Sequence, residues 1–406
     1  MENVILGKNV KKPVSEAGNV LVVGSAGSGK SYCYLEPNIK AVEDSDIVVI
    51  SPGNTLHEAT KASLEKKGYK IQVLDFCKKP TEMSHFNPFD CIFEAIDTFY
   101  IARNIIESTD NKTDTCDEFF KKAEEELLLA LIIYVNGRYK GEPEKRNLVT
   151  VKELLDEIAR RNAEDMSEVT NDIFMKDYLT YEDTVHEAMK FWKSFLQNSE
   201  ETRTAVIASL SARLSFMNID GVKDALKDSD IDFSVLNLDK DSDEKLAIFI
   251  QVPIYDTTFQ LISNFVIFAA FAQARHMSLH SRINGDIKRK NHVRFFVDEL
   301  SNIGRINELN FFMIVSKTHN ISIEAVTQDL SQIKALYENE TGTILSHMDN
   351  IVYMCSTDYL AKNFIAQSKT LLHMDNESVF ETAKLNANNC IIFSRKNSIV
   401  DEKYGM

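Results

Sequence analysis

The sequence predicts an α/β fold in which a mostly parallel sheet is interrupted by a helical segment. Three observations lead to this class: strands and helices alternate early in the chain, helical periodicity takes over in the middle, and apolar strands return in the second half. The chain has 406 residues, of which 44% are hydrophobic and 26% charged, which is enough for two or three domains. We expect a nucleotide-binding domain built from residues 1–92 and 236–406, with an all-helical domain at 93–235 inserted in it.

The first part of the chain alternates strand and helix. "NVLVVG" leads into a helix through "YLEPNIKAVE", and "DIVVIS" leads through "TLHEATKASLEKKG" to "KIQVLDF". Gly68 follows two lysines, as is typical of a helix C-terminus. Strand, helix and strand at this spacing predict a right-handed parallel unit.

The middle of the chain has helical periodicity. "DEFFKKAEEELLLALIIYV" is followed by "VKELLDEIARR", "TVHEAMKFWKSFLQ" and "TRTAVIASLSARLSFM". The first of these segments places one apolar stripe along a helix: Phe120, Ala123, Leu127, Ala130, Leu131 and Tyr134. Nearly continuous apolar runs then return, which is typical of strands buried on both faces: "KLAIFIQVP", "HVRFFVDEL", "ISIEAVTQ", "NIVYMCS" and "NCIIFSR".

Charge and cysteine content narrow the class of protein. A net charge of −15 argues against a protein that coats nucleic acid or anionic membrane over its whole surface, although a locally basic groove agrees with it. The run Lys288-Arg289-Lys290 and Arg294 are typical of a solvated turn before a strand, with a DNA-facing loop as the alternative. The six cysteines form no C-x-x-C pair and are expected to be reduced thiols. The apolar stretches are shorter than the roughly 18 residues of a membrane-spanning helix, so we expect no such segment in this chain.

A glycine-rich motif follows the first long strand. Gly24-Ser25-Ala26-Gly27-Ser28-Gly29-Lys30-Ser31 matches G-x-x-x-x-G-K-[ST], between a β-run and a helix. Backbone N–H groups of such a loop converge on phosphate oxygens, the lysine neutralises the β- and γ-phosphates, and the serine hydroxyl binds Mg²⁺. The motif predicts binding of ATP with Mg²⁺; the alternative is a glycine-rich turn without a ligand.

Hydrolysis of ATP requires further groups, and the strand "FFVDEL" ends in two of them. Asp298 is predicted to complete the Mg²⁺ shell with Ser31, and Glu299 to orient or deprotonate the attacking water. The alternative is a strand that ends in an acidic turn. Gln328 closes the next strand, either as a sensor of the γ-phosphate or as a polar strand end.

The order of these motifs resembles the coupling-protein ATPases of conjugation and type IV secretion, in the form common in Gram-positive mobile elements. The resemblance extends over nearly the whole chain, through "ILGKNV", the phosphate loop, "KGYKIQVLDF", "HFNPFD", "VPIYDTTFQLISN", "VRFFVDELSNIGRI", "NISIEAVTQDLSQIKALY" and "NCIIFSR". It implies a RecA-like P-loop ATPase that assembles as a homohexamer at the cytoplasmic face of the plasma membrane. Its implied partners are single-stranded DNA, the relaxase and the type IV secretion channel, with Gln328 as the sensor.

The chain departs from the family pattern at several places. Family members usually begin with membrane helices, whereas "ILGKNV" follows Met1 closely, so we expect membrane attachment through a missing segment or another subunit. Ser51 to Thr55 replace an acidic-Pro-Lys-Gly-Glu turn. The family's arginine-rich segment reads Lys317 to Ser322 here, which makes Lys317 the catalytic candidate in place of an arginine finger, with Arg305 as the alternative. The loop before the last strand is short.

Two functions follow as expectations. The first is an ATP-driven motor that translocates single-stranded DNA and relaxase to a type IV secretion channel during conjugative transfer. The alternative is a degenerate paralogue that binds ATP and assembles with an active motor but hydrolyses poorly, because lysine lacks the planar fork of arginine. A metabolic kinase is disfavoured, since the helical insertion has no evident place in one.

Overall fold

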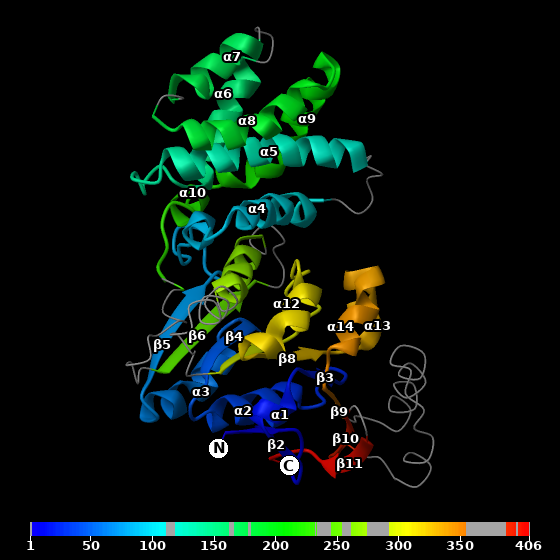
Figure 1. The fold of residues 1–406 in the computed structure, drawn as a ribbon. Helices are drawn as coiled ribbons and strands as arrows, with labels where there is room; N and C mark the ends of the chain where they lie inside the picture. Colours follow the sequence, from blue (N-terminus) through cyan, green and yellow to red (C-terminus); the bar gives the residue numbers. More distant parts are fainter. Residues whose placement is uncertain are drawn as a thin grey trace. The chain divides into compact units, whose positions relative to one another are not determined.

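A sheet of nine strands, in the order β11-β10-β9-β3-β8-β7-β4-β6-β5, forms the centre of one part of the molecule (Figure 1). The pairs from β9 to β5 are parallel, and β10 and β11 are added antiparallel. The structure, a computed structural model, describes residues 2–110, 118–161, 166–177, 180–231, 233, 245–253, 261–273, 292–354, 387–394 and 397–405. The predicted α/β class with a mostly parallel sheet is confirmed.

Each strand predicted from the sequence is present. They are β3 (Val20–Val23), β4 (Asp46–Pro52), β5 (Tyr69–Asp75), β6 (Lys245–Val252), β7 (Val293–Val297), β8 (Ile321–Thr327), β9 (Asn350–Met354) and β10 (Asn389–Ser394). The strand β11 (Asn397–Glu402) and the separate antiparallel pair β1 (Asn3–Ile5) and β2 (Lys11–Pro13) were not predicted, because β1 and β2 have only three residues each and β11 has only two apolar residues, Ile399 and Val400.

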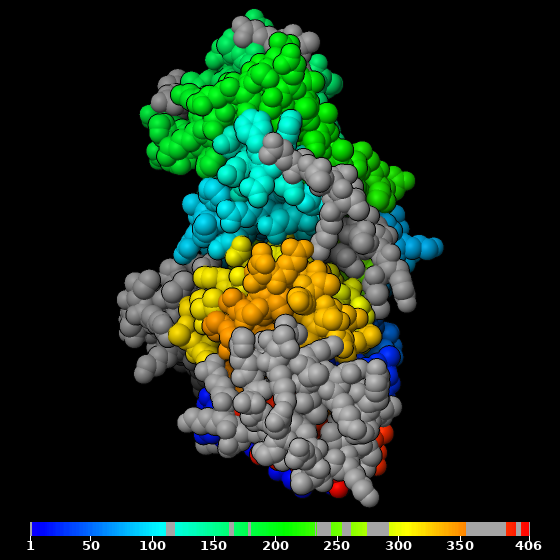
Figure 2. All heavy atoms as spheres, turned by 90° about the vertical axis from the view of Figure 1, so that its right-hand side faces the viewer, coloured from blue at the N-terminus to red at the C-terminus, as the bar shows by residue number. Residues whose placement is uncertain are grey.

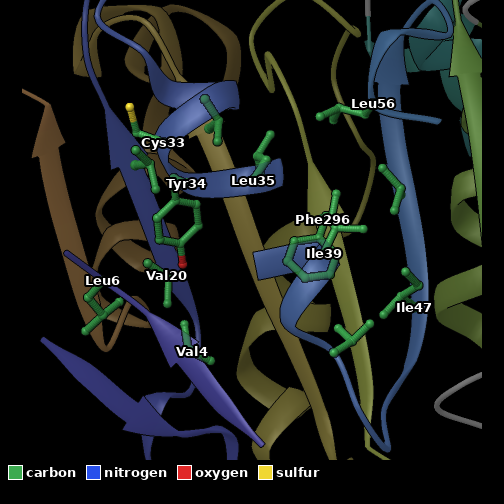
Figure 3. Close-up of a cluster of buried hydrophobic side chains, with 14 of the residues drawn as sticks. Val4, Leu6, Val20, Cys33, Tyr34, Leu35, Ile39, Ile47, Leu56 and Phe296 are labelled. Carbon is green, nitrogen blue, oxygen red and sulfur yellow. The ribbon is translucent and has the colours of Figure 1, made fainter. Parts of the chain in front are cut away.

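Helices cover both faces of the sheet. The helical turn Ser31–Leu35, α2 (Glu36–Ala41) and α3 (Thr55–Lys66) pack on one face, where Leu35, Ile39 and Leu56 belong to one buried cluster with Val20 and Phe296 of the sheet (Figure 3). Gly68 follows α3 with φ +81°, as its position after two lysines predicted. Burial on both faces explains the continuous apolar runs of the strands.

The other face of the sheet is covered by aromatic residues and by a second set of helices. Phe271 stacks on Phe295 of β7 at 4.0 Å between ring centroids and on Phe312 at 4.7 Å. Phe312 belongs to α12 (Leu309–Ser316), which lies near α13 (Leu330–Tyr337) and α14 (Thr341–Ser346) in Figure 1. Helices α13 and α14 are exposed on the face of the molecule that Figure 2 shows, where they are coloured orange. A further short helix, α1 (Val14–Ala17), precedes β3.

The chain divides into two compact units, and the second consists of Lys78–Asp232 and Leu261–Ala269. Its described elements are helical, so the sheet is interrupted in sequence between β5 and β6. Its α-helices include α4 (Ala95–Ser108), α5 (Glu118–Arg138), α6 (Leu148–Arg160), α7 (Met166–Ile173), α8 (Glu182–Leu196), α9 (Glu200–Arg213) and, shorter than these, α10 (Val222–Ala225). Five residues of the predicted stripe on α5 are buried, Ala123, Leu127, Ala130, Leu131 and Tyr134, whereas Phe120 in the first turn is only partly buried. The domain limits at residues 92 and 235 stay a prediction.

Arg294 corrects one interpretation of the sequence, because it does not lie in a solvated turn. It is 0% exposed on β7, and it donates from Nε to Glu324 Oε1 at 2.7 Å and from Nη1 to Glu2 Oε1 at 2.8 Å. Tyr34 donates its hydroxyl to Glu324 Oε2 at 3.0 Å. Burial opposes the ionisation of Glu2, but the charge of Arg294 and backbone N–H donors outweigh it and lower the pKa of Glu2 to about 2. Removing one partner of such a buried pair typically costs about 3–5 kcal/mol.

Other expectations concern the cysteines and the basic run. Cys33, Cys77, Cys91 and Cys390 are free thiols, as expected, whereas Cys116 and Cys355 lie outside the described residues. The run Lys288-Arg289-Lys290 and most of the loop before β10 also lie outside them. Within the described ranges, none of the helices combines the length and apolar character needed to cross a membrane.

Candidate nucleotide site

The glycine-rich loop leaves the central strand β3 and enters the turn before α2. Gly24 donates its N–H to the carbonyl of Thr327 at 3.2 Å, and a Cβ on Gly24 would lie 2.5 Å from Ser28 Oγ, so this position requires glycine. Gly27 and Gly29 have φ values of +75° and +88°, which glycine adopts without strain. The loop therefore has the strand-loop-helix setting that phosphate binding requires.

Two polar side chains of the loop are buried. Lys30 is 5% exposed and donates from Nζ to the carbonyl of Ser25 at 3.1 Å. Burial lowers the pKa of Lys30, and the charges of Glu299 and Asp298 oppose this shift. Among the described residues, no hydrogen-bond partner lies within reach of the buried Ser28 Oγ. A buried cation next to an unsatisfied hydroxyl suits a phosphate group, which would accept from both.

The loop meets the acidic strand end through Ser31. Its Oγ lies 3.1 and 3.3 Å from the two carboxylate oxygens of Asp298, which directly follows β7. Asp298 is 8% exposed, and its N–H donates to the carbonyl of Ile50 on β4 at 2.8 Å. Burial and the charge of Glu299 raise the pKa of Asp298 to about 6.

These two residues fit the magnesium shell that the sequence predicts. Mg²⁺ is usually held by one or two carboxylates together with phosphate oxygens and water. The hydroxyl of Ser31 and the carboxylate of Asp298 supply the protein oxygens, and a divalent cation would offset the cost of keeping Asp298 ionised in a buried place. Within the described ranges there is no group of three or more His, Cys, Asp or Glu residues that could hold a metal without phosphate.

Glu299 is held by two amides. Its Oε2 accepts from Gln328 Nε2 at 3.0 Å and from Asn302 Nδ2 at 2.9 Å, and its φ is +51°, an uncommon value outside glycine. Parallel pairing of β7 and β8 brings Gln328 to Glu299, a contact that the sequence did not predict, and the sensor role of Gln328 stays a prediction. The sequence did not single out Asn302; its signal would have been an amide in the turn that directly follows the acidic pair.

Lys317 lies at the opposite edge of the sheet. It belongs to the turn Lys317–His319 that precedes β8, whereas Asp298 and Gln328 follow their strands. Lys317 forms an ion pair with Asp349, just before β9. The structure therefore does not bring Lys317 to the phosphate loop of its own chain.

Arg305, the alternative to Lys317, and the turn from Ser51 to Thr55 also make local contacts. Arg305 pairs with Glu340 and lies over the ring of Tyr337, 5.4 Å from its centroid. In the turn after β4, Ser51 Oγ donates to the carbonyl of Gly53 at 3.2 Å, and Asn54 Nδ2 donates to Glu58 Oε1 at 2.6 Å. Their contacts thus hold local structure rather than reach the phosphate loop.

A comparison with protein families matches this chain over residues 5–371 to the family model described as type IV secretory system conjugative DNA transfer. The chain belongs to this family. The resemblance read from the motifs is thereby confirmed at the level of the conjugative DNA-transfer family, and the Gram-positive form stays an expectation. No curated protein sequence matches the chain.

Solved structures of conjugative coupling proteins share the fold. The bacterial conjugative coupling protein TrwBdeltaN70 in complex with sulphate aligns with a TM-score of 0.66 and 15% identity, covering 99% of this chain and 89% of that chain. The plasmid coupling protein TrwB in complex with ADP and Mg²⁺ aligns with a TM-score of 0.67 and 15% identity, covering 99% of this chain and 88% of that chain. VirB4 of Thermoanaerobacter pseudethanolicus gives 0.59 and 14%, covering 100% of this chain and 97% of that chain. The likeness confirms the RecA-like fold expected of the conjugative DNA-transfer family.

Proposed function

We propose that this member of the conjugative DNA-transfer family is an ATP-driven motor that translocates single-stranded DNA and its attached relaxase to a type IV secretion channel. The observation that carries the proposal is the contact of Ser31 with Asp298 beside the Glu299–Gln328 pair, since ATP hydrolysis would need these groups close to the phosphate loop. The family match and the ADP and Mg²⁺ bound by TrwB support ATP and Mg²⁺ as the ligands here.

Each side chain of the site then has a role. The backbone from Gly24 to Gly29 surrounds the phosphates, and Lys30 neutralises the β- and γ-phosphates. Ser31 and Asp298 hold Mg²⁺, which when bound neutralises charge developing on the phosphates. Glu299 orients the attacking water and accepts its proton, and Gln328 links the state of Glu299 to the γ-phosphate.

The partners follow from the family. We propose a homohexameric ring in which Lys317 enters the site of the neighbouring subunit, because its own chain places it at the far edge of the sheet. The helical unit would receive DNA and relaxase at the cytoplasmic face of the plasma membrane, and the net charge of −15 of the whole chain suits a basic protein partner rather than the DNA itself.

The proposal is tested by ATP hydrolysis with and without single-stranded DNA in the presence of Mg²⁺. We expect turnover that DNA stimulates and that Lys30→Ala abolishes. Lys40→Ala is the matched control, since Lys40 lies on α2 and pairs only with Glu36 among the ion pairs of the described chain. A Lys30→Ala variant with the turnover of the wild type would show that the site is elsewhere.

A second candidate function is a paralogue that binds ATP and joins an active motor but hydrolyses poorly. Lysine at position 317 favours it, because an arginine finger contributes about 10³ to 10⁵ in rate. Tight ATP binding without DNA-stimulated turnover supports this candidate. Turnover of about one per second or faster, a common value for enzymes, contradicts it.

A further inference from the structure

The segment "ILGKNV" near the start of the chain is not used by the proposed chemistry, yet it makes a specific contact with the C-terminal strand β11. Asp401 Oδ2 accepts from the backbone N–H groups of Asn9 at 2.8 Å and Val10 at 3.1 Å, and Oδ1 accepts from Asn9 Nδ2 at 2.8 Å. A Cβ on Gly7 would lie 2.5 Å from Asp401 Oδ2. The loop from Gly7 to Val10 therefore packs tightly against the Asp401 carboxylate and donates hydrogen bonds to it.

Two residues further along, Lys403 reaches the phosphate loop. Its side chain is 1% exposed, and Nζ donates to the carbonyl of Ser28 at 2.7 Å, across 375 residues of sequence. The N–H of Lys403 also donates to the carbonyl of Asn388 at 2.8 Å, which holds its backbone next to β10. The buried ammonium group of Lys403 thus donates a hydrogen bond to the Ser28–Gly29 peptide of the phosphate loop.

That contact fixes the direction of an N–H group. The carbonyl of Ser28 and the N–H of Gly29 belong to one peptide plane, and in a trans peptide they point in opposite directions. The described chain has no cis peptide bond, so the Gly29 N–H points away from Lys403. Gly29 has no Cβ to hinder rotation of this peptide, and an ammonium group on the carbonyl also polarises the N–H as a donor.

We propose that Lys403 is a positioning residue of the nucleotide site. It holds the Ser28–Gly29 peptide so that the Gly29 N–H meets a phosphate oxygen of a nucleoside di- or triphosphate, and Asp401 in the Gly7–Val10 loop keeps Lys403 in place. The C-terminal segment that follows β11 then helps to position the phosphate loop for nucleotide binding. This inference rests on the proposed binding of nucleotide.

The test is Mg²⁺-dependent binding of a fluorescent ADP analogue to the full chain carrying Lys403→Met, which keeps an apolar stem of similar length. Losing a hydrogen bond from a charged donor predicts a Kd about tenfold or more higher. Lys403→Arg, which keeps the charge and the donor, is expected to recover part of the affinity. Lys61→Met is the control, because Lys61 is an exposed lysine on α3 that pairs with Glu65 at 3.9 Å, and its Kd is expected to stay within about twofold.

A second measurement separates positioning from plain stability. We compare the thermal unfolding midpoints of wild type, Lys403→Met and Lys403→Gln without nucleotide and with saturating ADP and Mg²⁺. A smaller ADP-induced rise in both variants supports the proposal. A lower midpoint without ADP, combined with the full rise on adding ADP, overturns it, as does an unchanged Kd.

The two proposals fail differently. If the wild type binds the ADP analogue and Lys30→Ala does not, the proposed nucleotide site stands whatever Lys403→Met shows. If the wild type itself binds no nucleotide, the proposed function fails, and the positioning role of Lys403 fails with it. If Lys403→Met does not fold, the ADP-induced rise of Lys403→Gln decides.

Discussion

The carboxyl and amino edges of the central sheet, where the parallel strands end and begin, differ in which candidate site residues contact one another within a single chain. At the carboxyl edge, the phosphate loop, Asp298, Glu299 and Gln328 contact one another directly. At the amino edge, Lys317 pairs with Asp349, which also accepts from the N–H of Asn19. In the proposed function the contacts of the first edge would serve a nucleotide, whereas those of the second tie neighbouring strands together. Under the proposed function, Lys317 would act at the site of a neighbouring subunit.

The largest expected effect lies at the carboxyl edge. Glu299→Gln keeps the shape of the side chain but removes the group that accepts the proton of water, so kcat is expected to fall about 10²- to 10⁴-fold. The Kd for ATP is expected to stay within a few-fold, because Lys30 and Ser31 are untouched. Turnover and binding of a fluorescent ATP analogue measure the two quantities.

Glu308→Gln is a matched control for Glu299→Gln. Glu308 also has a positive φ, +61°, and it lies in the same connection between β7 and β8, just before α12. It is expected to leave kcat unchanged. An equal fall of kcat in both variants would mean that the whole connection between β7 and β8 is responsible, and it would show that Glu299 is not a catalytic residue.

The next effect is a dependence on pH at Asp298. Because its pKa is raised to about 6, protons compete with Mg²⁺ for this carboxylate below that pH. The affinity for Mg²⁺–ADP is expected to fall about tenfold for each pH unit below 6. A titration between pH 5 and pH 8, at fixed ionic strength, measures it. An affinity that is flat across this range would show that Asp298 does not hold the metal.

The same shift has a consequence for stability with the opposite sign. The pKa of Asp298 is about 6 in the folded chain and 3.8 as the ordinary value, so between these pH values the folded state binds more protons than the unfolded state. The free energy of unfolding therefore falls as pH rises through this window, by at most about 3 kcal/mol. Asp298→Asn lacks this loss. Without nucleotide it is expected to exceed the wild type in stability at pH 7.5 but not at pH 4, as measured by urea unfolding.

A smaller effect is expected at the amino edge. In the assembled ring, Lys317→Ala is expected to lower turnover about tenfold, and Lys317→Arg to raise it, because arginine stabilises phosphate charge with two donors. Asp349→Asn tests the ion pair separately, since it keeps Lys317 but removes its partner in the chain. Identical turnover in Lys317→Ala and wild type would confine the chemistry to the carboxyl edge.

The sequence predicted most of the sheet because burial leaves a local signal. Strands such as β4 and β8 are covered on both faces, so their apolar runs are continuous and easy to recognise. The phosphate loop and the Asp298–Glu299 pair were also predicted from short local patterns. The strand β11 lies at the end of the sheet, pairs only with β10 among the described strands, and has no such pattern.

The features that the sequence did not predict depend on contacts between distant parts of the chain. Arg294 looked like a solvated residue because the carboxylates that neutralise it, Glu2 and Glu324, lie 292 and 30 residues away. Lys403 lies 375 residues from Ser28. Local periodicity reports whether a position faces a core, but it does not report which charge will be its partner. Such pairs become visible only when the strands are in register.

The smallest predicted effect concerns Asn302 and tests how far the carboxyl edge is tuned. Asn302 and Gln328 both donate to Oε2 of Glu299, and in the described part of the chain neither of these side-chain amides donates to Oε1. Asn302→Ala removes one of two donors, so kcat is expected to fall about three- to tenfold while KM stays constant. Asn302→Asp places a like charge beside Glu299 and is expected to shift the acidic limb of the kcat–pH profile upward. A variant that lost stability alone would lower the amount of active protein without moving that limb, so the pH profile decides between positioning of Glu299 and support of the turn.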